Sequence, residues 1–443
     1  MKKKIKSSIK PAPFYFKEVG KEYLLTNDGG DFMLLNKGDF EDFSGGKMNQ
    51  NSRVFQDLLE KNFILKEKVV DKLAVKFASK SKALFSGPSL HIAVVTLRCN
   101  HKCLYCHASA QNMSRKDLDM NLETAKKTCN MIFQSTSDFI AIEFQGGEPL
   151  INWPVVKYII ERAQELNKKA KKDLEIRLVS NFSLMTEEKF KYLLSKKVSL
   201  CVSLDGPRKV HNQNRPMIGG DSYYHASKWL KEFNNLYPKL RKKGYIFKMG
   251  VSVTIGRNSL PFWKEIIDEY LKLGVDEFYL RPLNPFGFSL ARWKKIGYSV
   301  KQYVKFYEKA LDYIIELNKK GKKVKEKMAL TFLRKILTDT DPNHLDYRSP
   351  CGAGIGQLAY NWNGEVYTCD EGRMLSMMGD ENFNLGTVYK NSYEEIVSHP
   401  RVRTVCAASC LEGLAGCHDC VYKPYCGVCP IYNYSDCFEE RLQ

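Results

Sequence analysis

Long hydrophobic runs are missing from this sequence of 443 residues. No apolar stretch approaches the roughly 18 residues that a membrane-spanning helix requires, and residues 92–97 have only the length of a strand. The lysines at positions 2–4 are not followed by an apolar segment, so we expect no secretory signal peptide. The sequence therefore predicts a cytoplasmic protein without a membrane partner.

Acidic residues are in the minority, because 50 aspartates and glutamates stand against 69 lysines and arginines and leave a formal charge of +19. An acidic partner, either nucleic acid or an acidic peptide, is one explanation of this balance. The lysines are spread along the chain and are not interleaved with aromatic residues, which favours solvated helix ends instead. The charge alone therefore predicts no nucleic-acid partner.

Cysteine, in contrast, is plentiful, with 14 residues. Thiols stay reduced in the cytoplasm, so clustered cysteines indicate metal binding or redox chemistry and not disulfides. We interpret Cys129, in a helical stretch, and Cys201, in a strand, as small buried apolar residues. The remaining cysteines fall into two groups, one near residue 100 and one after residue 350.

Residues 1–85 are the first of three predicted domains and form a small α+β unit. The expected elements are two strands joined by a turn, followed by two helices, at residues 14–25, 30–35, 37–43 and 52–61. A polar joint leads to the next domain.

Residues 86–325 are the second predicted domain and alternate between strand-like and helical stretches. The six strand-like runs lie at residues 91–97, 139–144, 174–180, 199–204, 247–254 and 277–283. Helical stretches between them predict a parallel sheet with crossover helices. Six units are too few for a closed eight-stranded barrel, so the predicted fold class is α/β with an open, partial (β/α)6 TIM-like barrel. Functional side chains should lie at the carboxyl ends of its strands.

Residues 326–443 are the third predicted domain and are rich in cysteine, glycine and tyrosine. Residues 358–361 and 365–369 predict a hairpin around Asn363 and Gly364.

The first cysteine group follows the first strand of the predicted barrel with the spacing C-x3-C-x2-C. It consists of Cys99, Cys103 and Cys106. Three thiolates on one loop can hold three irons of a 4Fe–4S cluster and leave the fourth iron open for another ligand. A zinc ion closed by His101 or His107 is the alternative.

This spacing, with the aromatic Tyr105 before the third cysteine, resembles the signature of the radical S-adenosylmethionine (SAM) superfamily. The resemblance implies that SAM binds the open iron and is cleaved by an electron from the cluster. The resulting 5′-deoxyadenosyl radical then abstracts hydrogen from a substrate.

The ends of later strands carry further residues of this pattern. The second strand ends in the GGEP motif, Gly146, Gly147, Glu148 and Pro149. Glycines allow the backbone to approach a ligand, and the Glu148 carboxylate suits the SAM ammonium group. Further residues expected at the SAM site or the substrate lie at the ends of the third, fourth and sixth strands: Ser180, Asn181, Ser203, Asp205 and Arg281. Capping or turn roles remain open for Ser203 and Asp205, and a surface salt bridge for Arg281.

The C-terminal cysteines resemble the SPASM extension of radical SAM peptide maturases, which carries two auxiliary iron–sulfur clusters. The resemblance implies a distal cluster on Cys417, Cys420, Cys426 and Cys437, and a proximal one on Cys351, Cys369 and Cys429. For the fourth proximal ligand Cys410 is the first choice, Cys406 the second, and an open iron the third. The sequence departs from the pattern in having C-x2-C at Cys426 and Cys429, and a pair of zinc knuckles is the alternative for the region.

Asp370, directly after Cys369, matches a position at which sulfatase maturases are thought to place a proton acceptor. A structural role for this carboxylate is the alternative.

Several segments also resemble the His-Xaa-Ser system radical SAM maturases, among them residues 96–101, 143–150, 211–216, 352–356 and 423–427. The resemblance implies a ribosomally made precursor peptide with His-Xaa-Ser repeats as the partner, side-chain cross-linking as the reaction, and a flavodoxin or ferredoxin as the reductant. It also implies that the N-terminal unit recognises the peptide, where adding a peptide strand to a sheet edge is one known mode. A packing subdomain with no binding role is the alternative for this unit. Oxidation of a single Ser or Cys is the alternative reaction. An iron–sulfur or zinc protein that binds nucleic acid is the alternative class.

Overall fold

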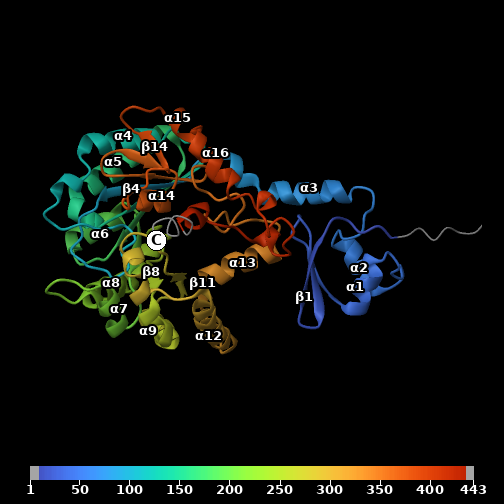
Figure 1. Cartoon of the computed structure of the whole chain (residues 1–443). Helices are drawn as coiled ribbons and strands as arrows, with labels where there is room; N and C mark the ends of the chain where they lie inside the picture. The colour runs from blue at the N-terminus through green and yellow to red at the C-terminus, as the bar shows by residue number, and fades with distance from the viewer. Residues whose placement is uncertain (1–8, 436–443) are drawn as a thin grey trace, which may run out of the picture. The chain divides into compact units, whose positions relative to one another are not determined.

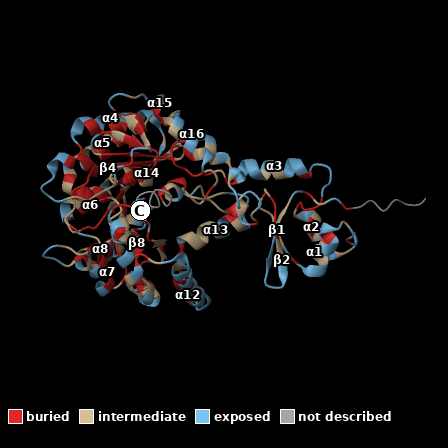
Figure 2. Ribbon diagram, in the orientation of Figure 1, coloured by how far each residue is buried: buried red, intermediate tan, exposed pale blue. Residues whose placement is uncertain are grey.

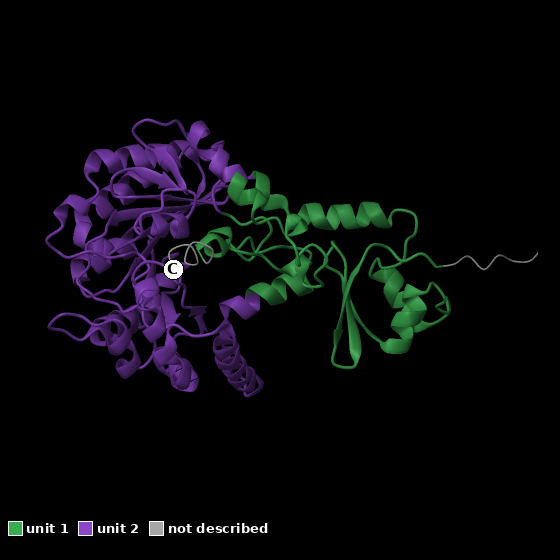
Figure 3. Ribbon diagram, in the orientation of Figure 1, with its two compact units in different colours: residues 1–85, 331–352, 404–443 green, residues 86–330, 353–403 purple. Residues whose placement is uncertain are grey.

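A computed structural model of the chain describes residues 9–435 (Figure 1). By contacts it divides into two compact units (Figure 3). Unit 1 comprises residues 1–85, 331–352 and 404–443, and unit 2 comprises residues 86–330 and 353–403. The predicted third domain is thus shared between the two units, and the three-domain division stays a prediction.

Unit 2 contains a sheet with the strand order β10-β8-β7-β6-β5-β4-β12-β13-β14. Its parallel part consists of β4 (Leu90–Thr96), β5 (Phe139–Gly146), β6 (Asp173–Ser180), β7 (Ser199–Ser203), β8 (Gly250–Ile255) and β10 (Leu280–Pro282). All but the first residue of β4 are buried, as expected for a parallel strand covered on both faces. The predicted α/β class with a partial barrel is confirmed.

Helices connect these strands and follow the last of them, and buried residues concentrate along the sheet and the helix sides that face it (Figure 2). The helices are α4 (Leu122–Ile132), α5 (Trp153–Ala170), α6 (Glu187–Ser195), α7 (Arg208–Asn214), α8 (Ser222–Lys242), α9 (Trp263–Lys272), α10 (Phe288–Ala291), α11 (Trp293–Ile296) and α12 (Val300–Lys319). Side chains at the N-caps explain where several of them begin: Asn121 accepts from Thr124 N–H and Thr186 from Lys189 N–H. Among residues 9–435, none of the helices is long and apolar enough to cross a membrane.

The predicted hairpin around Gly364 is confirmed, but it extends the barrel sheet. Strands β12 (Gln357–Tyr360) and β13 (Glu365–Tyr367) pair antiparallel, and Gly364 adopts a φ of +87° at the turn. Strand β12 also pairs parallel with β4, with Gln357 opposite Leu90, and β14 (Asn384–Thr387) pairs with β13. All four residues of β12 are buried, so this strand needs neighbours on both edges and both faces.

Between residue 320 and the end of the described chain at residue 435 also lie β11 (Lys325–Glu326), which pairs with β9 (Glu277–Phe278), and several α-helices. The helices are α13 (Lys327–Leu337), α14 (Asp370–Ser376), α15 (Tyr393–Val397) and α16 (Pro400–Ala407).

Unit 1 begins with a three-stranded antiparallel sheet, where the sequence predicted two strands. Its strands are β1 (Tyr15–Val19), β2 (Glu22–Thr26) and β3 (Phe32–Asn36). The predicted first strand is a hairpin, because the chain reverses at Gly20 with a φ of +65°. Helices α1 (Lys37–Ser44) and α2 (Arg53–Glu60) pack on this sheet around Leu25, Leu35, Phe43 and Leu58.

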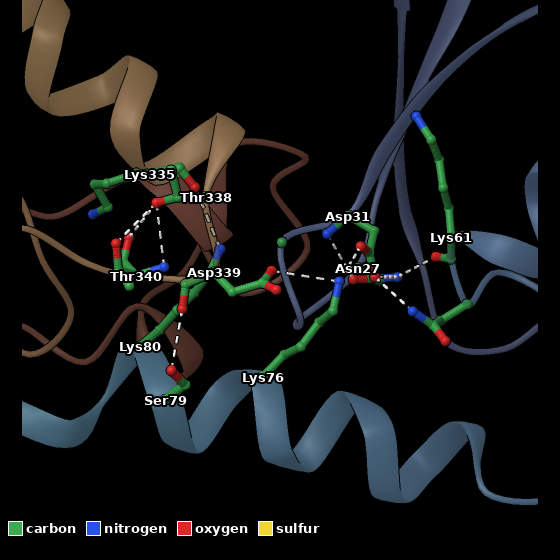
Figure 4. A network of polar contacts seen from close by, with 12 residues as sticks. Asn27, Asp31, Lys61, Lys76, Ser79, Lys80, Lys335, Thr338, Asp339 and Thr340 are labelled. Carbon is green, nitrogen blue, oxygen red and sulfur yellow. Dashed lines mark hydrogen bonds and ion pairs between the residues drawn. The ribbon is translucent and has the colours of Figure 1, made fainter.

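Helix α3 (Val69–Lys80) was not predicted, and it is held mainly by polar contacts within unit 1 (Figure 4). Only Val69 of this helix is buried, so the sequence shows little of the periodicity that marks an amphipathic helix. Lys76 donates to Asp31 at 2.5 Å and lies 3.5 Å from Asp339. Ser79 donates to the Asp339 carbonyl at 3.2 Å.

Candidate active site

Three cysteines on the loop after β4 line a single cavity. Cys99, Cys103 and Cys106 share a cavity of about 540 Å³ in unit 2 with apolar side chains that include Ile218 and Phe288. The structure thus brings these three predicted residues together at the carboxyl end of β4, where a parallel α/β sheet places its functional groups.

The environment of these thiols disfavours their charged forms. Burial raises the pKa of all three, and that of Cys103 to about 12. Cys103 and Cys106 also contribute to raising the pKa of Cys99. A metal ligand must be a thiolate, so a bound cation has to compensate for this burial. Among residues 9–435, no three His, Cys, Asp or Glu side chains converge as closely as a single metal ion requires.

The two glycines of the GGEP motif pack against the cysteine loop itself. A Cβ atom on Gly146 would lie 2.3 Å from the Thr96 carbonyl oxygen, and one on Gly147 would lie 2.1 Å from that of Arg98. The backbone N–H groups of Gly147 and Glu148 donate to these same two carbonyls, each at 2.8 Å. The close approach predicted for these glycines is therefore an approach to the base of the loop.

Glu148 is buried, and both of its carboxylate oxygens accept hydrogen bonds. Oε1 accepts from Ser180 Oγ at 2.7 Å and from Leu150 N–H at 3.0 Å, and Oε2 accepts from Asn181 N–H at 2.9 Å. Burial raises the pKa of Glu148, and these donors oppose that shift. The carboxylate therefore joins the end of β5 to the end of β6, and its role toward SAM remains a prediction. Pro149 begins the short 3-10 turn that follows.

Asn181 connects the end of β6 to the cysteine loop. Its Nδ2 donates to His101 Nδ1 at 2.9 Å and to Asn100 Oδ1 at 3.1 Å, and it lies 3.9 Å from Cys99 Sγ. Ser180 and Asn181 thus face the loop, as strand-end residues should.

Asp205, after β7, is fully buried and accepts from three donors. They are the hydroxyl of Tyr105, Arg215 Nε at 3.1 Å and Thr254 N–H at 3.2 Å. The Arg215 guanidinium also lies 5.3 Å from the centre of the Tyr105 ring. Asp205 therefore fixes Tyr105, the aromatic residue inside the cysteine motif. Ser203 is buried at the end of β7, and its predicted role stays open.

Two neutral histidines extend this network and were not predicted to belong to the site. His211 Nδ1 accepts from Asp205 N–H at 3.1 Å, so its Nε2–H faces Ser222 Oγ at 2.7 Å. His101 Nε2 lies 2.8 Å from the same oxygen. Burial lowers the pKa of His101 to about 3 and that of His211 to about 4. The sequence indicates His101 only as an alternative zinc ligand and as part of the family-like segment 96–101, and it indicates residues 211–216 only through family likeness.

The same segment also holds the backbone of the cysteine loop. Lys102 N–H donates to the Pro216 carbonyl and Leu104 N–H to that of Asn214, each at 2.9 Å. The loop between Cys99 and Cys106 is therefore held at both its backbone and its side chains.

Asp370 and Arg281 lie near this loop in unit 2 and have charged partners. Arg373 is fully buried and donates to Asp370 Oδ1 at 2.8 Å. Burial raises the pKa of Cys106, and the positive charge of Arg373 opposes this shift. Arg281 lies 3.7 Å from Glu371, the residue after Asp370. Roles of Asp370 and Arg281 in the reaction remain predictions.

The C-terminal cysteines are divided between the units. Cys369 belongs to unit 2, where its Sγ accepts from Gly372 N–H at 3.3 Å and caps α14. Unit 1 holds Cys351, Cys406, Cys410, Cys417, Cys420, Cys426 and Cys429. Within it, burial raises the pKa of Cys426, and Cys417 and Cys420 add to this effect, so these three lie close together. Cys437 falls outside the described residues. Cys129 is buried in α4 and Cys201 half-buried in β7.

Comparison with known proteins identifies the class. The sequence model of the Radical SAM superfamily matches residues 93–236, which contain the cysteine loop, the GGEP motif, and Asp205 with its partners Tyr105 and Arg215. A cysteine-type anaerobic sulfatase-maturating enzyme of Clostridium perfringens (strain 13 / Type A) is 27% identical over 294 residues, covering 64% of this chain and 74% of the relative.

Solved structures agree on the fold. The anSMEcpe structure with bound AdoMet matches with a TM-score of 0.62 at 21% identity, covering 80% of this chain and 96% of that one. Streptococcus suis SuiB bound to S-adenosylmethionine matches with a TM-score of 0.57 at 15% identity, covering 95% of both chains. The chain thus contains a radical SAM domain. It is a radical SAM enzyme related to peptide and sulfatase maturases.

Proposed function

We propose that this enzyme reductively cleaves SAM and uses the radical to cross-link side chains of a ribosomally made precursor peptide. One observation carries the proposal: Cys99, Cys103 and Cys106 line the same cavity. Three thiolates without a fourth cysteine on the loop suit a 4Fe–4S cluster with one open iron. When bound, the cluster and SAM would supply a 5′-deoxyadenosyl radical that abstracts hydrogen from the substrate.

The residues around the loop fit this function through what they hold in place. The GGEP backbone and Glu148 fix the base of the loop against β5 and β6. Asp205 and Arg215 orient Tyr105, and Asn181 orients His101. The side chains of this support are buried, which favours a fixed presentation of the thiols: Tyr105, His101, Glu148, Asn181, Asp205 and Arg215.

A peptide substrate is supported by the relatives. Structures exist of anSMEcpe with bound Cp18Cys peptide and of SuiB bound to the precursor peptide SuiA. In unit 1, β1 and β3 are the outer strands of the three-stranded sheet, and either could pair with an added peptide strand. We propose, on sequence likeness alone, that the substrate carries His-Xaa-Ser repeats. A flavodoxin or ferredoxin is the proposed electron donor.

Oxidation of a single Ser or Cys is the second candidate, and the likeness to a sulfatase-maturating enzyme favours it. In that case Asp370 would accept a proton, held in position by Arg373. Co-expression with a His-Xaa-Ser peptide or with a sulfatase peptide, followed by fragmentation mass spectrometry, separates the two. The nucleic-acid-binding alternative is disfavoured, because a binder needs neither three cavity-facing thiols nor the buried support beneath them.

The test of the proposal is the variant Cys99→Ala/Cys103→Ala/Cys106→Ala. We expect 5′-deoxyadenosine formation from SAM and dithionite to fall to background, because the variant has no thiolate to hold the cluster. The Cys201→Ala variant is the control, since this half-buried thiol lies in β7 and should leave the rate unchanged. Undiminished 5′-deoxyadenosine from the triple variant would refute the proposal.

A further inference from the structure

The cavity that Cys99, Cys103 and Cys106 line opens to solvent. Ile218 also lines this cavity and is 71% exposed, so the cavity reaches the surface of unit 2. We define the cavity rim as the exposed residues among those that line the cavity, namely Lys102, Asn112, Met113, Ile218, Phe288 and Arg292.

The cavity rim is joined directly to the cysteine loop. Arg292 Nη1 donates to the Leu104 carbonyl at 3.0 Å, and Phe288 N–H donates to the Cys106 carbonyl at 3.0 Å. Trp293, the first residue of α11, packs in the same apolar cluster as Leu104. A protein bound at the rim would therefore lie close to the three thiols, as electron transfer to a metal cluster between them requires.

Positive charge is concentrated at the rim, because the segments that form it contain no Asp or Glu. These segments are residues 98–114, 214–220 and 286–297. Two of their six lysines and arginines are neutralised, since Arg98 pairs with Asp119 and Arg215 with Asp205. The other four are exposed: Lys102, Arg292, Lys294 and Lys295.

Carboxylates close to these segments in the chain already have basic partners. Asp117 lies 2.7 Å from Arg115, and Asp221 lies 2.8 Å from Arg208. In the described part of the chain, no Asp or Glu lines the cavity. The rim therefore has an excess of positive charge that an acidic surface would balance.

Apolar side chains lie among these cations. Met113, Ile218 and Phe288 are exposed at the rim. Exposed apolar groups next to charged ones are typical of protein interfaces, which have an apolar centre and a polar periphery.

We propose that the cavity rim, extended by Lys294 and Lys295, is the docking surface for an acidic electron-carrier protein. This inference rests on the proposed function, which needs a reductant for the cluster on Cys99, Cys103 and Cys106. In the docked complex the carrier loses one electron and the cluster gains it, and no atom or proton is transferred. Complementary charge speeds such encounters by about 10–1,000-fold, and salt weakens the effect.

The test reverses two charges in the variant Lys294→Glu/Lys295→Glu. With oxidised flavodoxin as the probe, we expect the Kd measured by calorimetry at low salt to rise about tenfold or more, because attraction becomes repulsion. The variant Lys294→Arg/Lys295→Arg should keep the wild-type Kd. Added salt should weaken the binding of wild type more than that of the Glu variant.

Turnover separates docking from the later chemistry. With reduced flavodoxin, kcat/KM for 5′-deoxyadenosine formation should fall about tenfold in the Glu variant. With saturating dithionite the rate should equal that of wild type, because dithionite needs no docking surface. The matched control Lys242→Glu/Lys243→Glu should behave as wild type with both reductants. These exposed lysines end α8, which leads to the amino end of β8, the edge of the sheet opposite the cysteine loop.

Three outcomes would overturn the proposal. One is flavodoxin binding and turnover in the Glu variant equal to those of the control. Another is an equal loss of turnover with dithionite, which would indicate a structural role. The third is a higher Kd for a synthetic His-Xaa-Ser peptide with unchanged flavodoxin binding, which would assign the rim to the substrate. Wild-type enzyme that forms no 5′-deoxyadenosine even with dithionite would refute the proposed function, and the calorimetric Kd would still decide whether flavodoxin docks at the rim.

Discussion

Position 147 must be glycine, because its spatial neighbours leave no room for a Cβ atom. The Arg98 carbonyl oxygen would lie 2.1 Å from a Cβ at this position, well inside van der Waals contact. Two backbone hydrogen bonds hold this oxygen in position. It accepts from Glu148 N–H, and the nearby Thr96 carbonyl accepts from Gly147 N–H. Any side chain here must displace the residue that precedes Cys99.

We therefore expect Gly147→Ala to destabilise the protein by about 1–3 kcal/mol, as overpacking does. The displaced loop should also lose the SAM cluster, about four irons, and 5′-deoxyadenosine formation with it. Iron analysis and urea unfolding measure the two effects.

Gly256→Ala in the same unit is the matched control, because the nearest atom to its Cβ would be 3.9 Å away. A Gly147→Ala enzyme with full iron content and full 5′-deoxyadenosine formation would show that the loop does not depend on this close approach.

At the scale of elements, unit 1 joins sequence-distant segments through polar contacts. Thr26 on β2 donates to the Val421 carbonyl at 2.7 Å, and Lys423 donates to Tyr15 on β1 at 2.6 Å. Deleting residues 1–85 would therefore also expose these C-terminal segments. Peptide recognition is better tested by point substitution on an outer strand.

Leu34 on β3 is 48% exposed, and a peptide strand paired with this edge would cover it. Covering a leucine contributes about 1.5–3 kcal/mol, so we expect Leu34→Glu to raise the Kd for a synthetic His-Xaa-Ser peptide about tenfold or more. Fluorescence anisotropy measures the Kd. Formation of 5′-deoxyadenosine without peptide should stay unchanged, because unit 2 carries the cysteine loop.

Val75→Glu on α3 is the control for added charge in the same unit, since Val75 is 69% exposed and lies outside the sheet. Phe16→Glu examines the other outer strand, β1. Wild-type affinity in both the Leu34 and the Phe16 variants would contradict recognition at the sheet edges.

For the whole molecule, the distribution of cysteines predicts how much metal the chain holds. The three loop cysteines lie in unit 2, whereas all described C-terminal cysteines except Cys369 lie in unit 1. If all three clusters are 4Fe–4S, anaerobic reconstitution should give about twelve irons per chain, and the triple loop variant should retain about eight. A 2Fe–2S auxiliary cluster would lower both totals by two. A triple variant with two zinc ions and no iron would contradict the prediction and make the C-terminal region structural.

Redox chemistry is the reason to expect iron. An enzyme that oxidises its substrate must dispose of an electron after hydrogen abstraction, and zinc has no redox state that accepts it. Iron–sulfur clusters accept electrons at potentials that the protein can tune.

Local sequence was sufficient to predict an element or a site wherever one strand or loop carries a pattern of its own. The alternation of apolar runs and helices predicted the α/β sheet, and Asn363 and Gly364 predicted their hairpin. The spacing of Cys99, Cys103 and Cys106 predicted a shared site because the eight residues from Cys99 to Cys106 cannot separate them far. The turn at Gly20 and the polar helix α3 were missed, because neither changes the apolar pattern from which elements are read.

Only the tertiary structure decided which distant residues meet. Nothing in the spacing indicates that β12 pairs with β4, that Arg215 neutralises Asp205 beside Tyr105, or that Glu148 accepts hydrogen bonds from the end of β6. Pairing across a sheet, burial of charge and van der Waals contact depend on distances between segments far apart in the chain. Sequence by itself therefore determined the class of chemistry and the residues of the loop, whereas the packed fold decided their support, their charges and their neighbours.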